Sequence, residues 1–263
     1  MIMKYLKLYE EFVSKETKVN WGEAELEIKE MFRIFKELKQ LPSELIVDGE
    51  KFTIDKSIFN LDEPKEFETQ VDDINGKHTD TSKIGPTADE IISMKELTVS
   101  DKKVDAKPYY DFIKFCKKVF WKGQKVQLDK TTIQKLADDS QSIGRGEFSN
   151  FIKDASEYQR LSKAYDNTMT FLKEKGAEDK FNTTGLFSKY PDINKKDYND
   201  AVHYFDYYGK SYLFFEEQIR KGGKMPITSA IEIEGKWYIV GGNRRMSFYV
   251  LSGIDPVIWL TKL

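Results

Sequence analysis

The segment from Trp237 to Arg245 reads Trp-Tyr-Ile-Val-Gly-Gly-Asn-Arg-Arg, and the interpretation of the whole chain starts from it. An apolar run typical of a strand ends at two glycines, and residues 243–252 then show the apolar pattern of a short helix. Because glycine has no Cβ, the backbone can turn tightly here and approach a ligand closely. The first N–H groups of the helix have no partner within the helix and point outward. The segment therefore predicts a strand, a turn and a helix, with a binding site at the turn.

Two arginines give this turn its chemistry. Arg244 and Arg245 follow Asn243 directly, and the fork geometry of their guanidinium groups suits phosphate oxygens. Together with Gly241 and Gly242 these residues predict an anion site, most naturally a phosphate site. The alternative is an ordinary turn whose arginines are solvated or paired with nearby carboxylates. For the five residues alone the two interpretations have equal weight.

The surroundings of the segment favour the phosphate site. They predict, in chain order, a helix over 212–221, a β-hairpin over 227–233 and 236–240, the Gly-Gly turn, the short helix, and a last strand over 256–260. With Lys224-Met-Pro-Ile227 at its start and Gly253-Ile-Asp-Pro-Val-Ile258 at its end, this order resembles the ParB/sulfiredoxin fold. The close resemblance covers only the last fifth of the chain. Residues 91–99 resemble the first strand of that family more weakly.

The resemblance implies a nucleotide or phosphate site at Gly241, Gly242, Asn243, Arg244 and Arg245. In this family, partition proteins bind and hydrolyse CTP, sulfiredoxins use ATP, some archaeal relatives phosphorylate free serine, and others are described as nucleases. The resemblance therefore implies a nucleotide-dependent enzyme, most plausibly a phosphotransferase or NTPase that uses ATP or CTP with Mg²⁺. The alternative is a nucleic-acid-binding protein or nuclease of the same fold without a nucleotide cofactor. A purely structural module is the third interpretation.

Two departures from the family narrow this choice. Sulfiredoxins carry their reactive cysteine inside the loop, whereas the single cysteine here, Cys116, lies on an apolar helical stripe that predicts a buried thiol. Partition proteins usually have glutamate where Asn243 stands, and a DNA-reading region follows their loop. This chain ends at Leu263, so the sequence offers no such region downstream. Both of these specific activities are therefore disfavoured.

A lysine-rich segment carries the nucleic-acid alternative. Phe115, Phe120 and Trp121 are interleaved with five lysines, at positions Lys114, Lys117, Lys118, Lys122 and Lys125. Lysines that bind phosphates next to aromatic rings that stack on bases are typical of single-strand binding, and DNA or RNA would be the partner. The preferred interpretation is an amphipathic helix with a solvated lysine face.

Several weaker signals have a structural interpretation that is preferred to the functional one. A dense aromatic stretch over 204–215 predicts core rather than a base-stacking surface. His203 is more simply a structural histidine than a general base, and Arg145 is only a weak candidate for a second phosphate contact. The sequence does not decide whether a magnesium ligand or catalytic base is present among the following carboxylates: Asp206, Glu216, Glu217, Glu232 and Glu234.

The periodicities predict an α+β protein: a mostly helical N-terminal and middle region followed by a ParB/sulfiredoxin-like C-terminal domain. The predicted regions are residues 1–60 (a helix over 21–40 and a hairpin around Asp48-Gly49), 61–89 (a linker or exposed loop), 90–200 (mostly helical, with 91–99 as a strand) and 201–263 (the phosphate-binding domain). The helices expected beyond 100 cover the following ranges: 109–120, 131–138, 148–175 and 197–221.

Composition excludes several classes of protein. The 263 residues are 40% hydrophobic, and 42 basic against 44 acidic side chains give a net charge of −2, which excludes a globally basic nucleic-acid coat. One cysteine and two histidines exclude a cysteine-rich zinc site and a multi-histidine centre, so no metal ligands are predicted. No apolar run approaches the about 18 residues of a membrane span. We therefore expect a cytoplasmic protein without a membrane partner.

The opening Met3–Phe12 resembles the starts of many tailed-phage proteins, which suggests a viral protein in a bacterial host.

Overall fold

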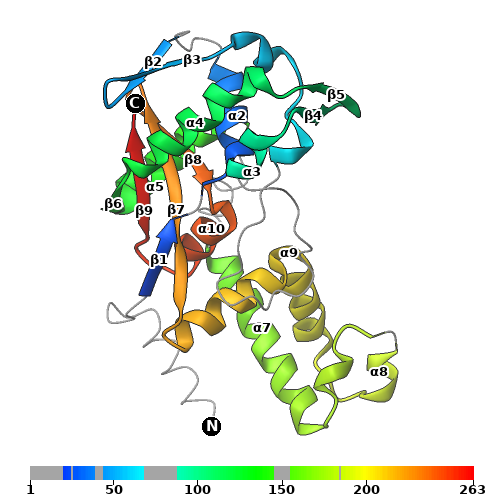
Figure 1. Ribbon diagram of the computed structural model, residues 1–263. Helices are drawn as coiled ribbons and strands as arrows, with labels where there is room; N and C mark the ends of the chain where they lie inside the picture. The colour runs from blue at the N-terminus through cyan, green and yellow to red at the C-terminus, as the bar shows by residue number, and fades with distance from the viewer. Residues whose placement is uncertain (1–19, 25, 39–43, 68–87, 145–154, 184) are drawn as a thin grey trace. The chain divides into compact units, whose positions relative to one another are not determined.

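The structure, a computed structural model, describes residues 20–24, 26–38, 44–67, 88–144, 155–183 and 185–263. The described residues form two compact units whose segments alternate along the chain. We call the one within Asn20–Ser149, Lys224–Asn243 and Asp255–Leu263 the sheet unit. The other lies within Asn150–Gly223 and Arg244–Ile254, and we call it the helical unit. The protein is thus a mixed α and β protein, as the sequence predicts (Figure 1).

The sheet unit contains a five-stranded sheet and two separate hairpins. The strands of the sheet are β1 (Asn20–Ala24), β6 (Gln124–Gln127), β7 (Lys224–Ile233), β8 (Lys236–Gly241) and β9 (Val257–Lys262). The hairpins are β2 (Glu44–Val47) with β3 (Glu50–Thr53), and β4 (Glu96–Val99) with β5 (Lys102–Asp105). Its helical elements are α2 (Ile28–Leu38), α3 (Ala88–Ser93), α4 (Lys107–Trp121), α5 (Lys130–Gln141) and the 3-10 turns η1 (Lys56–Asn60) and η2 (Lys65–Phe67).

The long strand β7 organises the sheet (Figure 1). β8 runs antiparallel and β9 parallel to almost the same stretch of β7, so the two lie on opposite sides of it. β1 runs parallel to the beginning of β7, where Ala24 lies beside Ile227, and β6 runs antiparallel to β9. The predicted hairpin and last strand are confirmed.

Turn chemistry explains the hairpins. Asp48-Gly49 joins β2 to β3 and Glu234-Gly235 joins β7 to β8, with all four residues at positive φ. Two consecutive left-handed residues form the tight turn whose twist matches that of the paired strands, and glycine adopts this conformation without strain. Both predicted hairpins are confirmed for this reason.

The sequence prediction is wrong in two places. Residues 20–24 form β1 instead of the first turns of a helix that would span 21–40, and α2 begins only at Ile28. Pairing with β7 outweighs the helical spacing here, and Gly22 weakens a helix. The expected first strand of the family at 91–99 is a helix, α3, followed by the short strand β4, which pairs with β5 and not with β7. The strand beside the start of β7 is β1.

An aromatic core lies between α2, α4 and the hairpin β2–β3. Phe32 and Phe35 on α2 meet the ring of Phe112 on α4 edge to face, and Phe115 does the same with Phe35. The core also buries the Cys116 thiol completely, as expected, and burial raises its pKa well above the usual value. Phe67 belongs to this core too, so the start of the predicted exposed loop over 61–89 is packed; residues 68–87 lie outside the described residues.

Helix α5 contacts β8 along the sequence that precedes the Gly-Gly turn. The Asp139 carboxylate accepts a hydrogen bond from the Trp237 backbone N–H at 2.9 Å, and the Ser140 hydroxyl accepts one from the Ile239 N–H at 3.1 Å. These side chains satisfy backbone donors of the strand that β7 does not reach. The position of β8, and of the turn that follows it, is therefore held from both sides.

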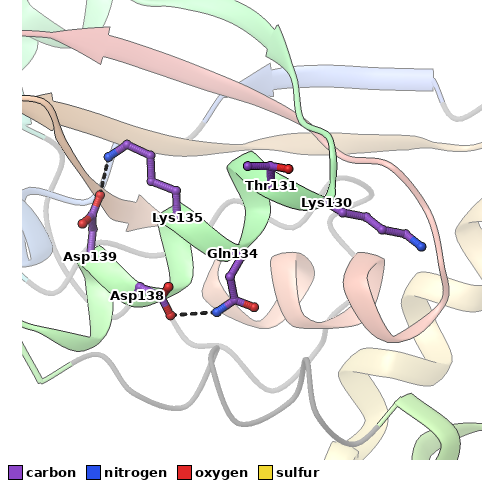
Figure 2. Close-up of a pocket in the computed structure, with 6 residues that line it drawn as sticks. All are labelled: Lys130, Thr131, Gln134, Lys135, Asp138 and Asp139. Atoms are coloured by element: carbon purple, nitrogen blue, oxygen red, sulfur yellow. Dashed lines mark hydrogen bonds and ion pairs between the residues drawn. The ribbon is translucent and has the colours of Figure 1, made fainter.

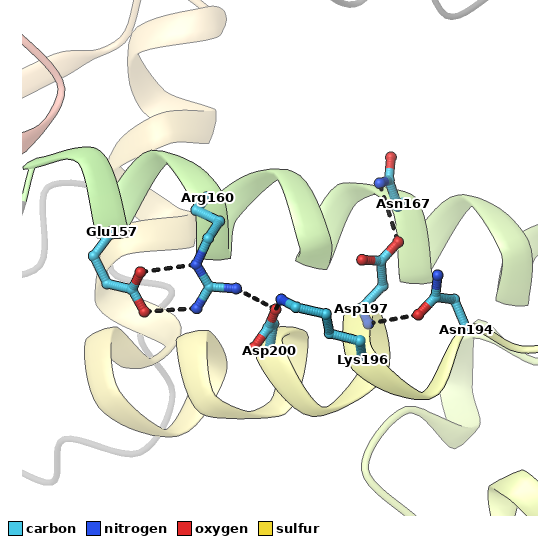
Figure 3. Close-up of polar contacts among 7 residues, drawn as sticks. All are labelled: Glu157, Arg160, Asn167, Asn194, Lys196, Asp197 and Asp200. Carbon is cyan, nitrogen blue, oxygen red and sulfur yellow. Dashed lines mark hydrogen bonds and ion pairs between the residues drawn. The ribbon is translucent and has the colours of Figure 1, made fainter.

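The helical unit is built on two long antiparallel helices. Its elements are α7 (Ala155–Glu174), η3 (Glu178–Lys180), α8 (Leu186–Lys189) and α9 (Lys195–Arg220). The helix α10 (Asn243–Leu251) also belongs to it, except for Asn243, which is part of the sheet unit. Arg160 on α7 binds Glu157 on its own helix and Asp200 on α9, and Lys196 binds the same Asp200 at 2.6 Å (Figure 3). The side chain of Asn194 caps the start of α9. The predicted helices over 148–175 and 197–221 are confirmed where the structure describes them.

Candidate phosphate-binding site

The Gly-Gly turn lies between a strand and a helix, as the sequence predicts. β8 ends at Gly241, which is buried and pairs with Ser229 of β7, and α10 begins at Asn243. Gly242 between them has a φ of 81°, in the left-handed region that favours glycine. Glycine is therefore the residue that this backbone conformation favours.

Both backbone groups of Gly242 have partners in the sheet unit. Its N–H donates a hydrogen bond to Oε1 of Glu27 at 3.3 Å, and its carbonyl accepts one from the hydroxyl of the buried Thr228 at 3.4 Å. Strand pairing explains why these residues meet: Ala24 lies beside Ile227 and Gly241 beside Ser229, so β1 and β8 both end next to Thr228. A carboxylate oxygen therefore lies against the turn at which an anion site is predicted.

The two arginines differ in their surroundings. Arg244 is exposed, whereas Arg245 is only 5% exposed. Neighbouring residues of an α-helix are about 100° apart around its axis, since one turn takes 3.6 residues, so their side chains leave α10 in different directions. Of the five predicted residues, Gly241, Gly242 and Asn243 belong to the sheet unit, and Arg244 and Arg245 to the helical unit.

The buried face of α10 packs into an aromatic core of the helical unit. Phe248, one turn after Arg245, contacts the rings of Tyr158, Tyr212 and Phe215 at centroid distances of 6.5, 5.7 and 5.6 Å. The expectation that the aromatic stretch over 204–215 forms core is confirmed for the residues buried there, which are Tyr204, Tyr212 and Phe215.

A buried carboxylate lies in the same core. Oε1 of Glu216 accepts hydrogen bonds from the hydroxyls of Tyr158 at 2.7 Å and Tyr204 at 3.3 Å, with the Ser162 hydroxyl at 3.5 Å. Burial, and secondly the negative charge of Glu216, raise the pKa of both tyrosines. Three hydroxyl donors compensate for the loss of water around this carboxylate. Glu216, a candidate base in the sequence, is thus part of the packed core.

Three of the five lysines in the candidate nucleic-acid-binding segment form ion pairs within the sheet unit. Lys118 binds Glu50 at 3.1 Å and Lys122 binds Asp48, both on the hairpin β2–β3, while Lys117 binds Asp89 of α3. Lys114 is exposed on α4. The lysine face of α4 is thus partly neutralised by acidic side chains from neighbouring elements.

The remaining candidates that the structure describes lie on α9, on β7 and in the turn after β7. His203 is exposed on α9, Glu217 of the same helix pairs with its C-cap residue Lys221, and Glu232 pairs with Lys262 at 3.1 Å. Arg145 lies outside the described residues, as do residues 1–19, which contain the opening that resembles phage proteins.

An open hollow of about 580 Å³ lies along α5 (Figure 2). Its lining comes from that helix alone, and the polar groups there bind one another: Lys135 binds Asp139, and Gln134 binds Asp138 at 2.7 Å. A one-sided surface of this kind does not enclose a ligand. Within the ranges that the structure describes, no group of three potential metal ligands occurs.

Sequence reasoning missed Glu27 and Thr228, which hold the turn. Thr228 directly follows the Pro-Ile pair of the predicted strand, but Glu27 fell within a predicted continuous helix. Only the recognition of β1 as a strand would have placed it near Gly242.

Comparison of the chain with protein-family models, curated proteins and solved structures found no match. None of the described helices is sufficiently long and apolar to span a bilayer.

Proposed function

We propose that this chain is a nucleotide-dependent enzyme of the ParB/sulfiredoxin fold, a phosphotransferase or NTPase that uses ATP or CTP with Mg²⁺. A phosphate of the nucleotide would bind at the segment from Gly241 to Arg245. The order of elements supports the fold: a strand parallel to β7, the hairpin β7–β8, the turn, α10, and β9 parallel to β7.

The observation that carries the proposal is the contact between the Gly242 N–H and a carboxylate oxygen at 3.3 Å. A turn that directs a backbone N–H to one anionic oxygen can direct it to another, and a phosphate oxygen is such an acceptor. Gly242 at a φ of 81° allows this approach because it has no Cβ.

The backbone and the side chains of the segment from Gly241 to Arg245 would have different roles in phosphate binding. The backbone of the turn fixes the position of the phosphate, and Arg244, which is exposed, is available to neutralise its charge. Arg245 is buried and is therefore less accessible to a ligand than Arg244. Electrostatic positioning of this kind is most of what phosphoryl transfer requires of a protein. Mg²⁺ typically binds through one or two carboxylates together with the phosphates of the substrate.

Isothermal titration calorimetry with ATP and CTP in the presence of Mg²⁺ tests this proposal. We expect one of the two nucleotides to bind, and Arg244→Ala to weaken its affinity by about tenfold or more, because a charge-assisted hydrogen bond contributes about 1.5–3 kcal/mol. Arg244 is exposed, so its removal should leave the fold intact.

Lys236→Ala is the matched control, since it removes an exposed positive charge at the far end of β8. Its affinity for the nucleotide should equal that of the unaltered chain. Equal affinities for Arg244→Ala and the unaltered chain would contradict the proposal.

The alternative function, binding of DNA or RNA, rests on one observation. Trp121 at the end of α4 is 75% exposed, next to Lys122 and on the same helix as Lys114. An exposed indole beside cations is able to stack on a base, and ion pairs at the surface are weak enough for phosphates to compete with them.

Affinity for a single-stranded oligonucleotide, measured over a range of salt concentrations, distinguishes this alternative. Binding that falls steeply with salt and is lost in Trp121→Ala would favour it, because stacking contributes about 1–3 kcal/mol per base. An absence of binding at low salt would eliminate it.

A further inference from the structure

We propose that Glu27 is an internal competitor for the phosphate site, and that phosphate binds only when its carboxylate leaves Gly242. This inference rests on the proposed function and adds its regulation: the unliganded chain keeps its own anion at the turn. The occupant that Glu27 excludes is an inorganic or nucleotide phosphate.

The contact at the turn is specific. The Gly242 N–H points to Oε1 of Glu27 at 3.3 Å, and the peptide group after Gly242 is held through its carbonyl by Thr228 at 3.4 Å. The peptide groups on both sides of Gly242 thus have partners, so the direction of its N–H is set by the fold. A phosphate oxygen that accepts from this N–H would take the place of the carboxylate oxygen, and the two negative groups would repel each other there.

The backbone on both sides of Glu27 is held by contacts other than the one with Gly242. It lies between β1, which is paired with β7, and α2, whose side chains at Ile28 and Met31 are buried. Its own side chain is half-buried. Release of Gly242 therefore involves the side-chain torsions of Glu27, while both flanking elements stay in place.

Competition of this kind lowers the apparent affinity of the site. If the carboxylate occupies the turn for most of the time, the apparent dissociation constant is the intrinsic one divided by the fraction of open molecules. A site that is open for about a tenth of the time would bind phosphate about tenfold more weakly than an open one.

Titration of the full ¹⁵N-labelled chain with inorganic phosphate, without divalent cations, tests the inference. The amide resonance of Gly242 reports binding at the turn directly. We expect Glu27→Gln, which keeps the shape but removes the charge, to lower the dissociation constant for phosphate about tenfold. Glu27→Ala should lower it at least as much, because it also removes the acceptor.

Glu37→Gln is the matched control, because Glu37 is exposed on the same helix, α2, and its loss changes the net charge equally. It should bind phosphate like the unaltered chain. If phosphate binds with equal affinity to all four proteins, Glu27 is not a competitor, although the phosphate site stands. If phosphate shifts the Gly242 resonance in none of them, both the inference and the proposed site are wrong.

Discussion

At the scale of the residue, Glu216 shows how the helical unit accommodates a charge. This side chain is 7% exposed, and its Oε1 accepts hydrogen bonds from Tyr158 and Tyr204. Removal of one donor leaves a buried carboxylate with less compensation for lost water, which costs more than an ordinary hydrogen bond.

We therefore expect Tyr158→Phe to lower the free energy of unfolding by about 1–3 kcal/mol, measured by urea denaturation. Tyr165→Phe is the control, because Tyr165 lies on the same helix, is only half-buried and packs through its ring against Phe181 and Phe205. It should change the free energy of unfolding by less than about 0.5 kcal/mol. Equal losses in the two variants would contradict the role given to the hydroxyl of Tyr158.

The residues of the candidate site show what composition and spacing can predict. Gly242 was predictable, because a strand followed by Gly-Gly and a helix requires a turn that glycine adopts most readily. The difference in exposure between Arg244 and Arg245 was not predictable, because charge gives no indication of which of two neighbouring side chains is buried. Nor could the sequence show that Lys118 and Lys122 pair with Glu50 and Asp48, because that depends on where the hairpin β2–β3 packs.

At the scale of the element, α5 and β8 form the support of the turn. Asp139 accepts hydrogen bonds from the Trp237 N–H at 2.9 Å and from Nζ of Lys135 at 2.6 Å. The same lysine donates to the Gly235 carbonyl at 2.6 Å, and its ammonium lies 5.5 Å from the Trp237 ring centroid. One helix thus fixes the beginning of the strand that leads to Gly241.

Asp139→Ala should lower the free energy of unfolding by about 1–2 kcal/mol, because it leaves the Trp237 N–H without this acceptor. Asp138→Ala is a close control: the neighbouring residue is exposed and binds Gln134 of the same helix, α5 (Figure 2). Amide hydrogen exchange at Trp237 should accelerate in the first variant only. Unchanged exchange there would show that α5 does not hold β8.

The contacts between α7 and α9 predict a pH dependence (Figure 3). The hydrogen bond from Lys196 is the largest cause that holds the pKa of Asp200 below its usual value; burial opposes it, and Arg160 lowers the pKa further. Because the pKa is lower in the folded state, these contacts stabilise the fold above the unfolded pKa of about 3.9, and the stabilisation is lost as the pH falls through the folded pKa.

The difference in unfolding free energy between the unaltered chain and Asp200→Asn should be about 1 kcal/mol or less at neutral pH and should shrink below about pH 4. Urea denaturation at several pH values measures it, with the exposed Asp192→Asn as control. A difference that stays constant down to the lowest pH would mean that Asp200 does not titrate with a lowered pKa.

Local signals at the level of the element were reliable where the turn determines the pairing. Asp48-Gly49 and Glu234-Gly235 fix both partners of their hairpins within a few residues. β1 carries no such signal: its partner β7 lies some two hundred positions further along the chain, and its spacing continues that of α2. For the same reason, the sequence did not show that Glu27 lies next to Gly242.

At the scale of the whole molecule, the chain passes between its two units several times. Residues 201–263, predicted as one domain, contribute most of α9 and of α10 to the helical unit and β7, β8 and β9 to the sheet unit. Periodicity predicts the type of an element, but the choice of partners depends on contacts between distant segments. The α+β class was therefore accessible from the sequence, whereas the division into units was not.

The central claim is that the turn at Gly242 binds a phosphate of a nucleotide. A crystal structure of the chain grown with Mg²⁺ and a non-hydrolysable ATP or CTP analogue measures this most directly. We expect a phosphate oxygen within about 3.2 Å of the Gly242 nitrogen, with the Glu27 carboxylate turned away from it. A nucleotide bound elsewhere, with Glu27 still at Gly242, would contradict the account.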